Sequence, residues 1–174
     1  MSFVTKVLGM FLGNKYEKDI KEISPYVEKI REEYEKLKTL TNDQLRECTF
    51  ELRKEIMAYV EPEEKEIKSL KEKADSEEDV DRKEDLYNQA DKHEKQINDK
   101  LEEILDRSVP MGFAIVRETA RRFKEHSQLE VTALQYDKDL AATRESITIE
   151  GNKAIWKNRW IAGGNEILWD MVHY

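Results

Sequence analysis

The chain has 174 residues, enough for one ordinary hydrophobic core. Charged residues make up 39% of it and the net charge is −8, so nucleic acid is excluded as a main partner, because binding phosphates requires a dense basic face. Glycine and proline are scarce, and with the high charge this composition favours long solvated helices over a compact globule.

Cysteine content and hydropathy indicate the compartment. The single cysteine, Cys48, permits no internal disulfide, which fits a reducing environment. We interpret it as a small, buried or half-buried helix residue rather than a nucleophile. There is no run of about 18 apolar residues, so no transmembrane helix is expected. Residues 1–12 are apolar but lack the basic start and the cleavage site of a signal peptide. We therefore expect a soluble, cytosolic protein.

The first predicted element is an amphipathic helix over residues 3–12. Its apolar positions recur at helical spacing, and lysines flank them. The apolar face consists of Phe3, Val4, Val7, Leu8 and Phe11, and the lysines are Lys6 and Lys15. Two interpretations remain open at this point. The helix either packs on the body of the protein or lies on anionic lipid or on a membrane partner.

Two helices are predicted next. Ser24 and Pro25 form a good helix start, because serine caps a helix and proline tolerates the first position, where no amide is needed. A second start lies at Thr41, where Thr41 and Gln44 match a capping box. Leu40 and Leu45 complete a hydrophobic staple around it. The second helix is expected to run from Asn42 to about Tyr59.

Pro62 opens a stretch, residues 63–106, in which nearly every side chain is charged or polar. Its sparse apolar residues alternate in steps of three and four, which is the spacing of a coiled-coil seam. They are Ile67, Leu70, Ala74, Leu86, Ala90, Ile97, Leu101 and Ile104, with His93 on the same seam. The acidic residues 75–81 interrupt the seam, so two antiparallel helices forming a protruding hairpin are favoured over one long helix. His93 is interpreted as an interfacial residue rather than a metal ligand.

Helices and a β-hairpin are predicted towards the carboxy terminus. Pro110 is expected to start a helix with a buried stripe. That stripe consists of Phe113, Val116, Ala120 and Phe123. Thr132 resembles another cap, for a short helix to about Thr143. Alternating β-branched residues around Gly151 and Asn152 predict a β-hairpin from residue 147 to residue 156.

The last predicted feature is an aromatic cluster. All three tryptophans, Trp156, Trp160 and Trp169, lie within the final 19 residues. Each aromatic side chain buries about 150–250 Å² when it is packed. We expect the tryptophans to pack the hairpin on the helices, and the remaining apolar surface of residues 156–174 to support self-association.

The sequence contains no catalytic constellation that we recognise. It has no glycine-rich Lys-Ser/Thr phosphate loop, no Cys or His pair at metal-ligand spacing, and no nucleophile with an adjacent base. Gly163 and Gly164 do not form a phosphate loop, because no basic residue or hydroxyl follows them in register. No catalytic residue and no metal ligand is therefore predicted.

Four stretches together resemble the amino-terminal region of the SecA family, in its Bacteroidetes type. The first is FLGNK at residues 11–15, with KDIK at 18–21. LTNDQLR at 40–46 is followed by TFELR at 49–53, and PMGFAIVRE lies at 110–118. The longest is IWKNRWIAGGNEI at 155–167, which continues to DMVHY at 170–174. Together they span the chain from end to end.

This resemblance implies a function for a larger protein. SecA is the motor of the bacterial preprotein translocase and couples ATP hydrolysis to export through the SecYEG channel. The resemblance implies ATP and Mg²⁺ as cofactors of the whole protein, with preprotein and anionic lipid as further partners. Met171 and Tyr174 match residues on the adenine side of the nucleotide pocket. The apolar face of residues 3–12, with Lys6, matches the membrane and channel contact, and the location implied is cytoplasmic and peripheral at the inner face of the cell membrane.

The fold expected from the sequence is mainly α. It is an elongated helical scaffold with a protruding antiparallel coiled-coil hairpin and a small β-hairpin near the C-terminus. The segments are 1–23, 24–61, 62–107, 108–145 and 146–174, the last leading towards a motor domain. The fragment itself is expected to supply contacts and scaffold, not catalysis. The alternative is a stand-alone helical adaptor whose hairpin binds a partner.

Overall fold

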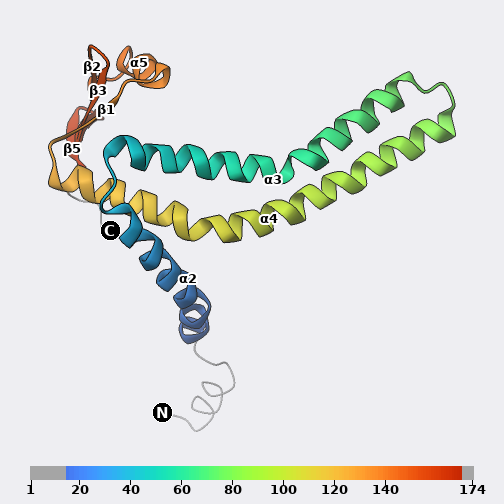
Figure 1. The fold of residues 1–174 in the computed structure, drawn as a ribbon, viewed down its shortest axis with the longest axis horizontal. Coiled ribbons are helices and arrows are strands. Elements are labelled where there is room, and N and C mark those ends of the chain that lie inside the picture. Colours follow the sequence, from blue (N-terminus) through green and yellow to red (C-terminus); the bar gives the residue numbers. More distant parts are fainter. Residues whose placement is uncertain (1–14, 170–174) are drawn as a thin grey trace, which may run out of the picture.

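The computed structural model describes residues 15–169, and it is mainly α-helical, as expected (Figure 1). The helices are α2 (Lys15–Leu37), α3 (Asn42–Ser76), α4 (Val80–Glu125) and α5 (Gln135–Ala141). The strands are β1 (Gln128–Thr132), β2 (Ile147–Glu150), β3 (Lys153–Lys157), β4 (Arg159–Ala162) and β5 (Asn165–Leu168). No helix within residues 15–169 is long and apolar enough to cross a membrane.

The predicted hairpin is confirmed and extends further than the charged stretch alone. Helices α3 and α4 lie side by side and reverse direction at residues 77–79 (Figure 1). The side chain of Asp79 caps α4 by accepting a hydrogen bond from the Arg82 amide. The seam residues that are fully buried are Leu70, Ala74, Ala90 and Ile104. The single-helix alternative is therefore wrong, and His93 lies half-buried on the seam.

The helix starts predicted at Ser24–Pro25 and at Pro110 are wrong, and so is the helix end predicted near Tyr59. Pro25, Pro62 and Pro110 all lie inside helices, so α2 begins before Ser24, α3 continues past Tyr59, and α4 runs unbroken to Glu125. A proline removes one intrahelical hydrogen bond and usually bends a helix. In Figure 1, α3 changes direction about midway along its length, which is where Pro62 lies. Packing of α3 along α4 outweighs this local cost.

The core forms where α2, α3 and α4 meet. It consists of Tyr34, Leu37, Leu45, Ala114 and Ile115, with Ile30, Leu40, Cys48, Leu52 and Met111 packed around them. Cys48 is half-buried there, as predicted, and burial raises the pKa of its thiol. The stripe predicted for α4 is partly wrong, because Phe113 and Val116 are 61% and 67% exposed. The face of α4 that packs on α3 and α2 is a different one.

Two small antiparallel sheets follow α4. Strands β2 and β3 form the predicted hairpin, with Gly151 in the left-handed region at φ +60°. Strand β1, which was not predicted, pairs with the other side of β3 and makes β3 the central strand. Strands β4 and β5 form a second hairpin that was also not predicted, and it turns at Gly163 and Gly164.

Helix α5 lies against β2. It forms in the region predicted for a short helix, but Thr132 does not cap it. Its first turn is fixed instead by Asp137, whose carboxylate accepts a hydrogen bond from the Leu134 amide.

Candidate functional site

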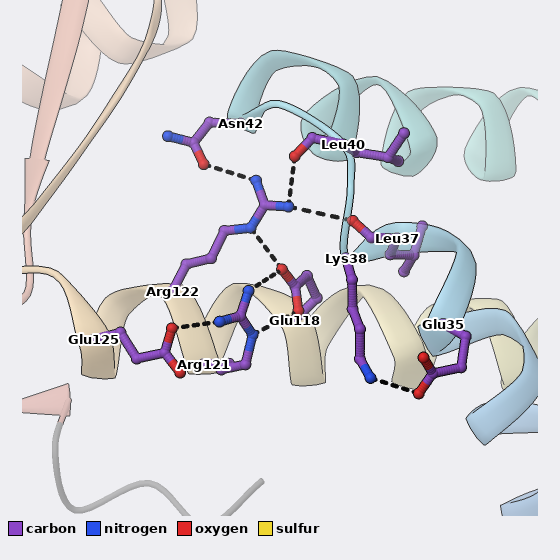
Figure 2. A network of polar contacts seen from close by, with 9 residues as sticks. All are labelled: Glu35, Leu37, Lys38, Leu40, Asn42, Glu118, Arg121, Arg122 and Glu125. Carbon is purple, nitrogen blue, oxygen red and sulfur yellow. Dashed lines mark hydrogen bonds and ion pairs between the residues drawn. The ribbon is translucent and has the colours of Figure 1, made fainter.

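Arg122 of α4 joins the three long helices at one point. Its Nε donates to the Glu118 carboxylate over 2.8 Å, and its Nη1 donates to Asn42 Oδ1 over 2.8 Å. Its Nη2 donates to the carbonyl oxygens of Leu37 and Leu40, at 3.3 and 2.7 Å. Figure 2 shows the guanidinium between the end of α2 and the start of α3. Arg122 thus adds a donor to the carbonyl of Leu37, the last residue of α2, and to that of Leu40 in the connection to α3.

Glu118 is fully buried and is held ionised by two arginines. Arg121 donates to both of its carboxylate oxygens, at 2.9 and 2.7 Å, and also to Glu125 (Figure 2). Burial favours the neutral carboxyl, but the hydrogen bonds from Arg121 and Arg122 outweigh it, so the pKa of Glu118 is lowered. We call this set of contacts the Arg122 junction.

Asp137 fixes the sheet to α3 in a similar way. Its carboxylate accepts two parallel hydrogen bonds from Arg46, at 2.8 and 2.9 Å, and one from Trp156 Nε1 at 3.0 Å. Asp137 is fully buried, yet its pKa is lowered, because the hydrogen bonds outweigh the burial that would raise it. Trp156 therefore packs the hairpin on the helical part, as predicted for the tryptophans.

The first turn of α3 also covers the outer edge of β1. Asp43 accepts hydrogen bonds from the amide and the hydroxyl of Thr132, both at 2.7 Å. Asn42 Nδ2 donates to the Glu130 carbonyl at 3.0 Å. Unpaired backbone groups on an exposed edge strand can form hydrogen bonds with a strand of another chain. These side chains occupy the edge and fix the orientation of the sheet.

An apolar cleft of about 590 Å³ opens between α3, α4, β1 and α5. Its walls are largely aromatic and aliphatic, and they include Phe50, Ile115, Phe123, Leu129, Val131 and Trp156. Two of its arginines, Arg46 and Arg122, are already engaged by Asp137 and Glu118. The third arginine of the lining, Arg53, has no ion pair among those found for the described residues.

Apolar side chains remain exposed on α4 next to the aromatic cluster. Trp169 stacks on Phe123 with 5.6 Å between ring centroids, and Trp160 lies 5.7 Å from Trp169. These contacts cover the end of an α4 stripe whose remaining members, Phe113 and Val116, are exposed. Leu105, about two helical turns from Phe113 towards the hairpin, is 49% exposed. We call Leu105, Phe113 and Val116 the α4 stripe.

The residues that the resemblance marked for function lie outside the described part. This holds for the adenine-side pair Met171 and Tyr174 and for the membrane set, which is Phe3, Val4, Lys6, Val7, Leu8 and Phe11. Within residues 15–169, no group of three His, Cys, Asp or Glu side chains is arranged to hold a metal ion.

The two buried carboxylates were missed by sequence reasoning. Glu118 precedes Arg121 and Arg122 by three and four residues, which is the spacing of side chains that meet on a helix. That signal was readable, but it did not distinguish a buried pair from an exposed one. Asp137 meets Arg46 across 91 positions, and no local pattern reveals such a contact.

The fold and these surfaces define an elongated helical protein whose rigid junctions orient a small sheet and leave apolar surface uncovered. A family model, the SecA DEAD-like domain, matches residues 8–143. The chain therefore belongs to the SecA family.

Relatives named protein translocase subunit SecA match nearly all of the chain. The one from Parabacteroides distasonis is 45% identical over 172 residues, covering 99% of this chain and 15% of the relative. The one from Amoebophilus asiaticus is 47% identical over 171 residues, with 97% and 15% covered. The one from Flavobacterium psychrophilum is 40% identical over 174 residues, with 100% and 16% covered. The chain thus spans about 15% of the length of these relatives, and no solved structure matches it.

Proposed function

We propose that this chain is the amino-terminal scaffold of a SecA translocase motor. The whole protein would use ATP and Mg²⁺ to drive preproteins through the SecYEG channel, and this part would supply contacts rather than chemistry. The observation that carries the proposal is the identity of 45% along nearly the whole chain to one end of a translocase subunit. The described residues support it with exposed apolar surface on α4 and with two buried arginine–carboxylate contacts that orient the sheet on the helices.

The α4 stripe is the surface that we expect the rest of the motor to cover. It lies on the same helix as Phe123, which stacks on Trp169, the last residue that the structure describes. Exposed apolar side chains that form a continuous patch usually mark a contact surface. Docking there would connect the motor rigidly to the Arg122 junction and, through α4, to the hairpin.

The docking can be tested in the full-length protein with two matched substitutions. Phe113→Asp together with Val116→Asp places charge on the α4 stripe, whereas Val80→Asp places charge on an apolar residue that is 75% exposed at the hairpin tip. We expect the first change to reduce preprotein-stimulated ATP hydrolysis strongly and the second to leave it near the parent value. Equal activity of the two proteins would overturn the proposal.

The same variants of the 174-residue chain separate docking from folding. All three positions are solvent-exposed, so thermal melting of the isolated chain should change little in either variant. The isolated chain should also release phosphate from ATP only at background level, because it has no phosphate loop. Turnover that survives repurification and scales with chain concentration would contradict this part.

We further propose that residues 3–12 bind anionic membranes as an amphipathic helix. Phe3, Val7 and Phe11 would supply apolar burial, and Lys6 would add attraction of about 1 kcal/mol near a charged surface. Flotation of the chain with anionic vesicles tests this. Val7→Asp with Phe11→Asp should abolish flotation and Val80→Asp should not, and undiminished flotation of the first variant would refute membrane binding.

A further inference from the structure

Helix α2 carries an apolar stripe that is only half covered. Its members follow one another in alternating steps of four and three along the whole helix. They are Tyr16, Ile20, Ile23, Val27, Ile30, Tyr34 and Leu37. The last three pack in the core between α2, α3 and α4. The first four are 68%, 46%, 54% and 37% exposed, in that order.

The exposed half arises because α2 leaves the body of the protein. Its later part contacts α4, where Tyr26 donates a hydrogen bond to Asp106 and Tyr34 faces Arg117. Its amino-terminal part projects away from α3 and α4 (Figure 1). A helix face that is apolar and continuous with a buried seam is built to pack on another apolar element.

The length of chain before α2 fits this surface. Residues 1–14 lie outside the described part, and the apolar face predicted for residues 3–12 would extend about 15 Å as a helix. The exposed stripe from Tyr16 to Val27 extends about 17 Å along α2. Residues 13 and 14 are Gly and Asn, a connection within the range of about two to five residues that joins antiparallel helices.

The register of the two stripes also agrees. In an antiparallel pair of helices, residues at equal distance from the connection lie opposite each other, because the rise per residue is the same. Phe11 then lies opposite Tyr16, Val7 opposite Ile20, and Val4 opposite Ile23. Each of these three pairs joins two apolar residues, whereas Leu8 lies opposite Asp19 and Val27 lies beyond the reach of residues 3–12.

We propose that residues 3–12 fold back as an antiparallel helix on the exposed stripe of α2, where they cover Tyr16, Ile20 and Ile23. In solution this contact shields the apolar face of residues 3–12 from water. It goes beyond membrane binding and does not depend on it, although both would use the same face. A surface that binds this face more tightly than α2 does would release it.

Disulfide formation tests the contact in the whole chain. In a Cys48→Ser background, Val7→Cys is combined either with Ile20→Cys, on the stripe, or with Lys18→Cys, on the opposite side of α2. Lys18 is closer to Val7 in sequence than Ile20 is. If residues 3–12 did not dock on α2, the Val7–Lys18 disulfide of the control would therefore form at least as fast as the Val7–Ile20 disulfide. We expect the Val7–Ile20 disulfide to form at least about tenfold faster, because docking raises the effective concentration of the two thiols.

Non-reducing electrophoresis and mass spectrometry give the outcomes. A rapid disulfide within one chain, at a rate independent of protein concentration, supports the proposal. Equal rates for the two pairs would overturn it. Disulfide-linked dimers formed in preference would also overturn it and would assign the stripe to a second copy. No lipid is present in this reaction, so failure of the membrane proposal does not affect the result.

Discussion

The two ends of α4 are stabilised in opposite ways. In the distal hairpin, residues 63–106, α4 packs along α3 through a narrow apolar seam with charges outside it, such as the Lys71–Glu94 pair, and meets α2 at the Tyr26–Asp106 hydrogen bond near its base. At the Arg122 junction it meets α2, α3 and β1, and the charges lie inside. The same helix can therefore be an extension into solvent at one end and the centre of a rigid assembly at the other.

The net charge follows the same division. Residues 63–106 contain 17 acidic and 9 basic side chains, which accounts for the whole net charge of −8 and leaves 21 of each sign elsewhere. An excess of like charge opposes compact packing and favours solvation. Where charges are balanced and paired, as around Glu118, they can be buried. Charge balance and apolar content therefore both distinguish the two regions.

The sharpest test of this comparison is Glu118→Gln. It keeps the shape of the side chain but leaves Arg122 buried without its counter-charge, and breaking a buried pair costs about 3–5 kcal/mol. We expect urea unfolding to show a loss of that size. The matched change in the hairpin is Glu94→Gln, whose partner Lys71 is 47% exposed and remains solvated. If both variants lost a similar free energy of unfolding, the buried charges of the junction and the exposed charges of the hairpin would contribute equally, and the comparison would fail.

Acid should weaken the junctions around Glu118 and Asp137. The pKa values of Glu118 and Asp137 are lowered in the folded protein, so the folded state binds fewer protons than the unfolded state. Their stabilisation is complete above about pH 4–5 and is lost as the pH falls through the folded-state values. We expect the free energy of unfolding to decrease from about pH 5 to about pH 3. Glu118→Gln should flatten this decrease, and an unchanged slope would show that other carboxyls cause it.

Removing the distal hairpin should leave the junction folded. Replacing residues 63–106 with a short Gly/Ser linker deletes a seam that buries only its own two helices, together with the Tyr26–Asp106 contact. We expect calorimetry to retain one cooperative transition with a modest shift in Tm. Loss of the transition would mean that the hairpin is part of the core.

The smallest expected effect concerns association through the C-terminal aromatics. Trp160 and Ile161 in β4 are 38% and 61% exposed, so we expect the isolated chain to self-associate through this region. Ending the chain after Asn158 removes β4 and β5 but keeps β3, the central strand of the other sheet. Light scattering should then report a monomer. If the shortened chain were still an oligomer, the chains would associate through the α4 stripe or through the hairpin instead.

Part of this architecture could be predicted from local sequence. The Thr41–Gln44 capping box is present as expected, with Thr41 Oγ1 accepting from the Gln44 amide and Gln44 Oε1 accepting from the Thr41 amide. The seam of the hairpin and the β2–β3 turn at Gly151 were also readable. The Gly163–Gly164 pair was a turn signal for β4 and β5 that went unused.

The sequence by itself determined that the protein is a highly charged, mainly helical member of the SecA family, because helix periodicity, caps and short motifs are encoded within a few residues. Tertiary structure alone decided that three prolines remain inside helices, that β1 adds to β3, and that Glu118 and Asp137 are buried. Each of these depends on partners far away in the chain, such as Arg46 for Asp137 and Asn42 for Arg122. Packing and charge neutralisation at these contacts outweigh the local preferences. A local stretch of sequence does not reveal which distant residue will become the partner.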